Sequence, residues 1–326
     1  MNDKLYLLKP AYKDYLWGGE ILKDNYGKQT DIFPLAESWE CSVHPDGPSI
    51  VCETGETLTD LIVAHPEYMG SHAAKVADSR FPILVKLIDA GQNLSIQVHP
   101  DDEYARIHEN GSLGKTEMWY ILEAEPDACI VYGFNQDVSA DQVRNAVENN
   151  TIEQILNHVP IKRGDVFLIE PGTVHSIGKG CVVAEIQESS NLTYRLYDYN
   201  RTDAKGRKRE LHIDKALDVL NLKNSSIPNQ PMRVLRYRNG FASEILGRCR
   251  YFQVERILTN TDSVNNSVTL NTTDNSFHVL LCVDGRVELR SSSSEVKLGK
   301  GDCCFIPAGV RNVEISGKSQ IIYIGC

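Results

Sequence analysis

The segment Gly164-Asp-Val-Phe-Leu-Ile-Glu-Pro-Gly-Thr-Val-His175 joins a Gly-Asp turn, a short apolar strand and a Pro-Gly turn that ends in a histidine. The same pattern returns in Gly301-Asp-Cys-Cys-Phe-Ile-Pro-Ala-Gly-Val-Arg311. Each copy is preceded by an apolar run that ends in turn residues, at 118–126 and 277–285. Two related β-barrels are the simplest explanation of this internal repeat.

The rest of the chain also favours a mainly β protein with a few helices. Helical patterns cover residues 57–78, 139–158 and 213–220, and Ser139 with Gln142 forms a capping box at the start of the second. Short β-branched and aromatic runs, typical of antiparallel barrels, lie at 83–88, 94–98, 118–122, 166–169, 182–186, 194–199, 252–257, 279–283, 287–289 and 321–324. The pattern resembles the cupin superfamily, which implies two jelly-roll barrels.

A polar segment at 221–231 is the best candidate for a linker between the barrels. We therefore expect an N-terminal catalytic domain at 1–225, with the metal site and the helices, and a C-terminal cupin-like domain at 226–326. Alignment of the two repeats places Arg311 opposite His175, and Ser276 opposite Glu117. The second copy thus lacks the histidine and the carboxylate that could bind a metal in the first. The second barrel is therefore predicted to lack a metal and to have a packing or lid role.

Composition excludes several classes of protein. The 326 residues carry 34 Lys and Arg against 44 Asp and Glu, a net charge of −10, which disfavours nucleic acid or an anionic membrane as partner. No apolar run approaches the roughly 20 residues of a membrane span, and the N-terminus does not resemble a signal peptide. Nine scattered cysteines without a C-x-x-C pair predict reduced thiols. We expect a cytoplasmic monomer or small homo-oligomer.

The run Leu94-Ser-Ile-Gln-Val-His-Pro places three polar residues on one side of a strand. Ser95, Gln97 and His99 alternate, so their side chains share a face, and the apolar residues between them take the other. Pro100 ends the strand, and the acidic residues 101–103 favour a helix N-terminus. A single histidine is more often structural than a ligand, so its neighbours decide its role.

Two further candidate ligands join this face. Glu117 begins the next strand and His175 ends the first repeat, so both should lie at the barrel mouth beside His99. Two imidazoles and one carboxylate, with Gln97 as a fourth donor, suit a divalent metal ion. Zinc is the first choice, although iron, manganese and cobalt accept the same ligand types. Because positions remain for water or substrate, the site is predicted to be catalytic.

Two lysines lie near this predicted site. Lys86 stands in an apolar run, where burying a charge is costly unless it forms an ion pair or has a functional role. Alternatively, its ammonium reaches solvent at a strand end. Lys115 precedes the predicted carboxylate ligand by two residues, and its alternative role is that of an ordinary loop lysine.

An arginine is the candidate anion ligand. Strand alternation predicts one face for Thr193, Arg195, Tyr197 and Tyr199. An arginine inside a barrel can bind an oxyanion or a phosphate, with help from Arg201. Alternatively, Arg195 pairs with Glu185.

The ordered motifs resemble the type I mannose-6-phosphate isomerases, in their short bacterial form. They are Leu16-Trp-Gly-Gly, Phe81-Pro-Ile-Leu-Val-Lys, Leu94-Ser-Ile-Gln-Val-His-Pro-Asp-Asp, Gly114-Lys-Thr-Glu-Met-Trp-Tyr, Pro171-Gly-Thr-Val-His and Thr193-Tyr-Arg-Leu-Tyr-Asp-Tyr. The resemblance implies a zinc-dependent aldose–ketose isomerase whose small phosphosugar substrates are mannose 6-phosphate and fructose 6-phosphate. It implies metal ligands at Gln97, His99, Glu117 and His175, catalysis by Arg195, and substrate contacts from Ser95, Lys86 and Lys115.

Isomerisation moves a proton between C1 and C2 through a cis-enediol. Lys86, Lys115, Glu185 and a metal-bound water are all candidates for the proton shuttle. We expect a lysine whose pKa is lowered by burial near the cation.

Two other functions fit part of the pattern. His99, Glu117 and His175 also match the facial triad of a ferrous-iron cupin oxygenase, but the cations nearby favour a phosphorylated substrate. A non-catalytic sugar-binding cupin would tolerate loss of the ligands, which are present here.

Overall fold

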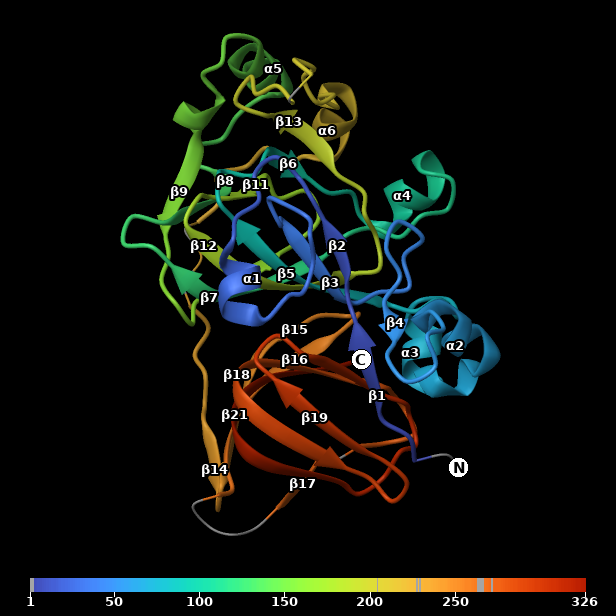
Figure 1. Ribbon diagram of the computed structural model, residues 1–326. Coiled ribbons are helices and arrows are strands. Elements are labelled where there is room, and N and C mark those ends of the chain that lie inside the picture. The colour runs from blue at the N-terminus through green and yellow to red at the C-terminus, as the bar shows by residue number, and fades with distance from the viewer. Residues whose placement is uncertain (1–2, 204, 227, 229, 263–266, 271) are drawn as a thin grey trace.

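The computed structural model describes residues 3–203, 205–226, 228, 230–262, 267–270 and 272–326. Three antiparallel sheets form most of the molecule, as the sequence predicts for a mainly β cupin fold. Figure 1 shows two stacked parts: most strands up to β13 lie in the upper part with the helices α5 and α6 at its end, and the late strands β14–β21, joined by β1 and β4, form the lower part.

The upper part consists of two sheets that enclose an apolar core. The six-stranded sheet has the order β10 (Val166–Ile169), β7 (Glu117–Ala124), β12 (Cys181–Glu188), β5 (Ile83–Ala90), β3 (Glu37–Cys41) and β2 (Ala11–Lys13). The five-stranded sheet has the order β13 (Tyr194–Tyr197), β6 (Ile96–Val98), β11 (His175–Ile177), β8 (Cys129–Phe134) and β9 (Leu156–Pro160). Side chains of both sheets, such as Trp119 and Ile130, pack in one buried cluster.

The lower part is a ten-stranded sheet that folds around a second core. It contains β14 (Arg236–Arg238), β15 (Phe241–Arg248), β16 (Gln253–Asn260), β17 (Val268–Leu270), β18 (His278–Arg290), β19 (Glu295–Gly299), β20 (Cys303–Ile306) and β21 (Val313–Gly325). Two early strands, β1 (Tyr6–Lys9) and β4 (Ile50–Val51), complete it, with Tyr6 opposite Phe305. The domain boundary after residue 225 stays a prediction, and residues 227 and 229 of the expected linker lie outside the described residues.

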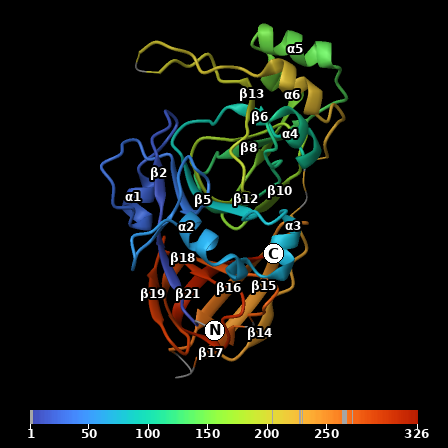
Figure 2. The ribbon, with the colours of Figure 1, turned by 90° about the vertical axis from the view of Figure 1, so that its right-hand side faces the viewer.

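The helices are short. They are α1 (Ile21–Tyr26), α2 (Leu58–Ala64), α3 (Ser71–Val76), α4 (Asp102–His108), α5 (Ala140–Glu148) and α6 (Ile213–Val219), with 3-10 turns at Pro66–Met69 and Ile152–Ile155. The turned view in Figure 2 shows α5 and α6 together beyond β13 and β6. Helix α6 agrees with the prediction for 213–220.

Two expected helices are shorter than their sequence patterns. The pattern at 57–78 is divided by Pro66 and by Gly70, whose φ is 82°. The capping box of Ser139 and Gln142 is confirmed, but α5 ends at Glu148 because Asn150 takes a positive φ of 58°. The last residues of this expected helix, 156–158, belong to strand β9 (Leu156–Pro160) instead.

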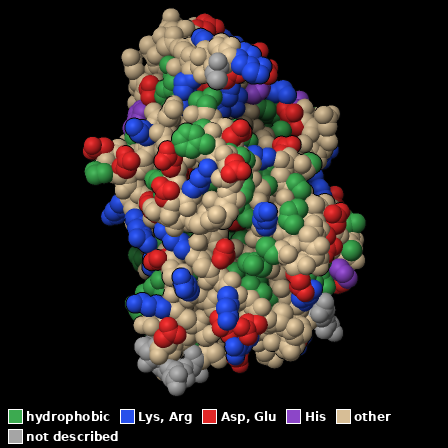
Figure 3. Space-filling model, in the orientation of Figure 1, with side chains coloured by type: hydrophobic (Ala, Val, Ile, Leu, Met, Phe, Trp, Pro, Cys, Tyr) green, Lys and Arg blue, Asp and Glu red, His purple; other side chains and the backbone are tan. Residues whose placement is uncertain are grey.

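The surface and the thiols agree with the composition. Figure 3 shows acidic and basic side chains interspersed over one face of the molecule. All nine cysteines are free thiols. None of the helices formed by the described residues has both the length and the apolar character needed to cross a bilayer.

Candidate active site

Strand register brings the predicted polar face together. On the five-stranded sheet, Gln97 of β6 lies opposite His175 of β11 on one side and Arg195 of β13 on the other. Ile96 and Val98 point the other way, into the apolar cluster that also contains residues of α5 and α6. The alternation predicted for this strand is therefore confirmed. Asp101 caps the following helix α4 by accepting a hydrogen bond from the Tyr104 amide.

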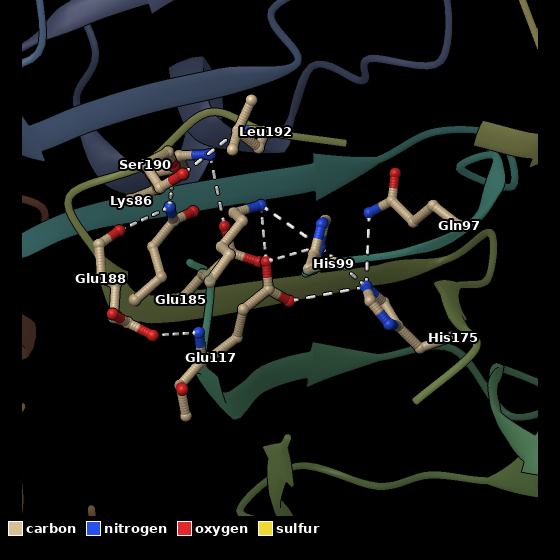
Figure 4. A network of polar contacts seen from close by, with 12 residues as sticks. Lys86, Gln97, His99, Glu117, His175, Glu185, Glu188, Ser190 and Leu192 are labelled. Atoms are coloured by element: carbon tan, nitrogen blue, oxygen red, sulfur yellow. Dashed lines mark hydrogen bonds and ion pairs between the residues drawn. The ribbon is translucent and has the colours of Figure 1, made fainter. Parts of the chain in front are cut away.

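His99, just after β6, converges with Glu117 of β7 and His175 of β11 in the interior of the upper part. Nε2 of His99 lies 3.1 Å from Oε1 of Glu117, and Nε2 of His175 lies 3.7 Å from Oε2. The two Nε2 atoms are 3.1 Å apart. One ligand atom from each residue falls within 4.8 Å of the others, and all three side chains are buried. Figure 4 shows the Glu117 carboxylate facing both imidazoles from one side, with Gln97 beside His175.

Both imidazoles are neutral and one of them is clearly oriented. Burial, with the Lys115 ammonium nearby, lowers the pKa of His99 to about 3, and burial also lowers the pKa of His175. Nδ1 of His175 lies 2.8 Å from the Thr173 carbonyl oxygen, to which it donates a hydrogen bond. The lone pair of His175 is therefore on Nε2, which faces Glu117. A carbonyl that fixes the tautomer in this way is typical of a metal-binding histidine.

The carboxylate completes a donor set that fits a divalent cation. Burial alone would raise the pKa of Glu117, but Lys115 and His99 hold it well below its usual value, so the group is ionised. Two neutral imidazole nitrogens and one carboxylate, all shielded from solvent, are the ligands that zinc and its neighbours prefer. The amide nitrogen of Gln97 lies 3.4 Å from Nε2 of His175, which places this amide at the edge of the same cluster.

A cavity of about 250 Å³ opens beside the cluster and contains most of the predicted substrate groups. Gln97 and Lys115 line it next to the histidines. Its other polar and aromatic lining residues are Tyr15, Trp17, Glu37, Lys86, Ser95, Trp119, Glu185, Asn191, Thr193, Arg195 and Arg209. Trp17 belongs to the motif at 16–19, so this early segment forms part of the cavity wall.

Arg201 and Arg209 have different positions relative to this cavity. Arg201 is not among the lining residues, because its guanidinium bonds the Asp198 carboxylate and the Asn93 carbonyl. Arg209 takes a lining position and forms two hydrogen bonds with Asp198, at 2.6 and 2.8 Å. Sequence reasoning missed Arg209, which follows the loop closed by the bridge between Thr202 and Lys208 and stands in no periodic strand.

Lys86 belongs to a buried ionic network. Its Nζ lies 3.6 Å from Oε2 of Glu37 and 3.4 Å from Oε1 of Glu185. The indole nitrogen of Trp119 donates to Glu185 and to Glu117, so the network reaches the candidate metal ligands. Burial by itself lowers the pKa of Lys86, but the two carboxylates outweigh it and the pKa is raised. The expectation of a lysine with a lowered pKa is therefore wrong for Lys86.

The pKa of Glu185 is also raised, which for a carboxyl favours the neutral form. Burial and the negative charge of Glu117 raise its pKa, although the neighbouring lysines oppose this. Its carboxyl faces Lys86 and lines the cavity, so the alternative that it pairs with Arg195 is wrong. A carboxyl group with a raised pKa is a stronger base than an exposed one.

Lys115 points inward and is 4% exposed, so it is not a solvated loop lysine. Its Nζ lies 2.6 Å from Oε1 of Glu117 and 3.4 Å from Nε2 of His99. It is therefore in contact with two candidate ligands and with the cavity.

Arg195 reaches the cavity from β13. Its Nε donates to Oγ of Ser95 at 3.3 Å, and its Nη1 donates to the Glu210 carbonyl at 2.8 Å. The face predicted for this segment holds only in part, because the register shifts after Arg195. Tyr197 and Tyr199 consequently pack against the apolar cluster of α5 and α6, while Thr193 stays with the cavity.

Comparisons with known proteins agree with this geometry. A model of the catalytic domain of phosphomannose isomerase type I matches residues 5–130, and a model of the mannose-6-phosphate isomerase cupin domain matches residues 246–325. Mannose-6-phosphate isomerase ManA of Bacillus subtilis is 35% identical over 325 residues, which cover 99% of each chain. The mannose-6-phosphate isomerase of Streptococcus mutans is 34% identical and covers 99% of this chain and 98% of its own.

A solved structure supports the same relationship. The crystal structure of the mannose 6-phosphate isomerase from Bacillus subtilis superposes with a TM-score of 0.88 at 33% identity, covering 98% of this chain and 99% of that one.

Proposed function

The chain belongs to the type I phosphomannose isomerase family, and we propose that it interconverts mannose 6-phosphate and fructose 6-phosphate with one divalent metal ion. The observation that carries this proposal is the cluster of His99, Glu117 and His175, whose ligand atoms lie within 4.8 Å of one another beside a cavity that contains lysines and arginines. A protein of net charge −10 needs such local cations to bind a phosphorylated sugar.

His99, Glu117 and His175 would hold the ion, and we assign Gln97, whose amide lies 3.4 Å from Nε2 of His175, as the fourth ligand. We propose zinc, because two imidazoles and a carboxylate with an open position match catalytic zinc sites. A bound zinc ion supplies Lewis acidity that polarises the sugar carbonyl.

Three charged side chains would carry the proton transfer. Glu185 lines the cavity and has a raised pKa, so it is suited to accept the proton that leaves one carbon of the sugar and to return it to the neighbouring carbon. Lys86 stays protonated and holds the Glu185 carboxyl in place at 3.4 Å. The ammonium of Lys115 faces the cavity beside Glu117 and stabilises the oxygen on which negative charge develops.

Two arginines at the other side of the cavity would bind the phosphate. Arg195 presents a guanidinium that Ser95 and the Glu210 carbonyl orient, and Ser95 itself can donate to a phosphate oxygen. Arg209 adds a second guanidinium held by Asp198. The guanidinium of Arg201 already bonds Asp198 and Asn93, so we assign it a structural role beside the cavity rather than substrate contact.

A coupled assay tests the proposal. Purified protein is incubated with mannose 6-phosphate and the formation of fructose 6-phosphate is followed, then the assay is repeated after chelation and after addition of zinc. Activity that chelation abolishes and zinc restores supports the isomerase, and elemental analysis of the purified protein identifies the metal. Oxygen uptake with ferrous iron and no isomerase activity would instead support the oxygenase alternative.

We also propose a cytoplasmic location, because nine free cysteines suit a reducing compartment. A monomer or small homo-oligomer stays a prediction.

A further inference from the structure

Two carboxyl groups, from the half-buried Asp102 and the buried Glu188, hold the backbone on both sides of Lys115. The Gly114 amide donates to Oδ1 of Asp102 at 2.9 Å, and the Thr116 amide donates to Oε1 of Glu188 at 2.7 Å. The Lys115 amide itself donates to the Pro100 carbonyl at 3.0 Å. Three successive backbone amides are therefore fixed, which sets the direction in which the Lys115 side chain leaves the loop. Figure 4 shows the Glu188 end of this arrangement close to Glu117.

Gly114 brings the loop against the start of helix α4. A Cβ on this residue would lie 2.5 Å from backbone atoms of Asp101 and Asp102, which is closer than any side chain tolerates. The loop therefore has little freedom to shift along the helix. Asp102 is the first residue of α4, and its carboxylate accepts the hydrogen bond from the Gly114 amide of the loop.

Glu188 and Asp102 form an acidic pair under the loop. Glu188 is the last residue of β12 and is 1% exposed. Burial, together with the negative charge of Asp102, raises its pKa to about 8, so the carboxyl is neutral at neutral pH. A neutral carboxyl beside a carboxylate avoids the repulsion of two charges and can still accept the Thr116 amide.

Tyr251, which contacts Asp102 of this acidic pair, comes from the lower part of the molecule. Tyr251 lies on the turn between β15 and β16, and its hydroxyl donates to Oδ2 of Asp102 at 2.7 Å, across 149 residues of sequence. Among the described residues, the last one that lines the cavity is Arg209, so strands β14–β21 contribute nothing to its wall. Tyr251 nonetheless reaches the carboxylate that holds Gly114.

We propose that Asp102, Glu188 and Tyr251 are positioning residues that keep the Lys115 ammonium at the metal site and the cavity. The late sheet thereby contributes to catalysis through one tyrosine hydroxyl, without touching the substrate. This inference rests on the proposed isomerase function, in which Lys115 stabilises developing charge.

The first test is Tyr251→Phe, which removes one hydrogen bond to a carboxylate and keeps the ring. We expect kcat to fall roughly tenfold, with KM and metal content within about twofold of wild type, because a bond to a charged group is worth about one such factor. Tyr104→Phe is the matched control: its hydroxyl donates to Asp218 at 3.0 Å from the same helix α4 and, within the described part of the chain, forms no hydrogen bond with residues 114–116. Equal kcat values in the two variants would overturn the proposal.

The second test separates a positioning role from simple packing. Glu188→Gln keeps an oxygen for the Thr116 amide and offers an NH₂ group to Asp102, so it mimics the neutral carboxyl. Glu188→Leu fills similar space and makes neither contact. We expect Glu188→Gln to keep at least about half of the wild-type kcat, and Glu188→Leu to lose about tenfold or more. Equal damage by both substitutions would contradict the proposal.

A third measurement does not depend on turnover. An amine-reactive acylating reagent is applied to wild type, Tyr251→Phe and Tyr104→Phe, and modification of Lys115 is followed by peptide mass spectrometry. A several-fold faster reaction in Tyr251→Phe alone supports the proposal, and an unchanged rate overturns it. Wild-type protein without isomerase activity would refute the proposed function instead, while this readout would still decide whether Tyr251 positions the lysine.

Discussion

The ammonium of Lys115 lies 2.6 Å from Oε1 of Glu117, and both side chains are almost completely buried. The same carboxylate oxygen lies 3.1 Å from Nε2 of His99. The Lys115 ammonium and the imidazole of His99 therefore contact the same oxygen atom of Glu117. Because like charges repel, Lys115 opposes the binding of a metal ion while it supplies positive charge to the cavity.

Replacement of Lys115 by Met should therefore separate metal binding from turnover. We expect the zinc content of the purified variant to equal or exceed that of wild type, since one positive charge is removed. The kcat should fall about 10²–10⁴-fold, the usual effect of losing a group that acts on the developing charge or proton. Lys223→Met, which removes an exposed lysine paired with Asp137, is the control and should change neither quantity. Normal turnover in Lys115→Met would refute the role of this lysine.

Metal removal should lower stability, because the three candidate ligands lie on or beside β6, β7 and β11. An ion bound only by the folded state adds about 2.7 kcal/mol to the free energy of unfolding when its free concentration is 100 times Kd. We expect the melting temperature to drop after chelation and to rise again with added zinc. Glu117→Gln should lose this zinc response. A melting temperature that is insensitive to zinc in wild type would argue against the site.

Much of this site was visible in the sequence because it depends on local alternation. The polar face of Ser95, Gln97 and His99 follows from the two-residue period of a strand, and the repeat placed Glu117 and His175 near it. Register then brings these residues together, as in the pairing of His175 with Gln97. The same periodicity failed after Arg195, where a bulge changes the register in a way that composition does not reveal.

The charges and hydrogen bonds of the site that the sequence did not reveal depend on contacts between segments far apart in the chain. The pKa of Lys86 depends on Glu37 and Glu185, which reach it from the two strands that flank β5. The hydrogen bond of Tyr251 to Asp102 likewise joins segments with no shared pattern. Such contacts are fixed by the packing of sheets, so a single sequence without its fold gives no signal for them.

The buried carboxyl of Glu188 should make stability depend on pH. Its pKa is about 8 in the folded protein and 4.5 without burial, so the folded state holds the proton over this window while the unfolded state loses it. The stability that this group contributes is present below pH 4.5 and is lost as pH rises toward 8. Glu188→Gln does not titrate. We therefore expect its free energy of unfolding, relative to wild type, to increase from pH 5 to pH 8 in urea titrations. A constant difference would mean that the carboxyl is ionised throughout.

The buried pair of Lys28 and Glu40 offers a test of how the two parts of the molecule are joined. Their charged atoms are 2.6 Å apart, and the ammonium also donates to the Gly301 carbonyl of the ten-stranded sheet region. Burial raises the pKa of Glu40 and Lys28 opposes this, so Lys28→Met would leave a buried carboxyl without its partner, at a cost of about 3–5 kcal/mol in the free energy of unfolding at pH 7. The double variant Lys28→Met with Glu40→Leu should recover most of this loss, because no buried charge remains. If the double variant were as unstable as the single one in urea titrations, the loss would come from the contact with Gly301 rather than from the unpaired carboxylate.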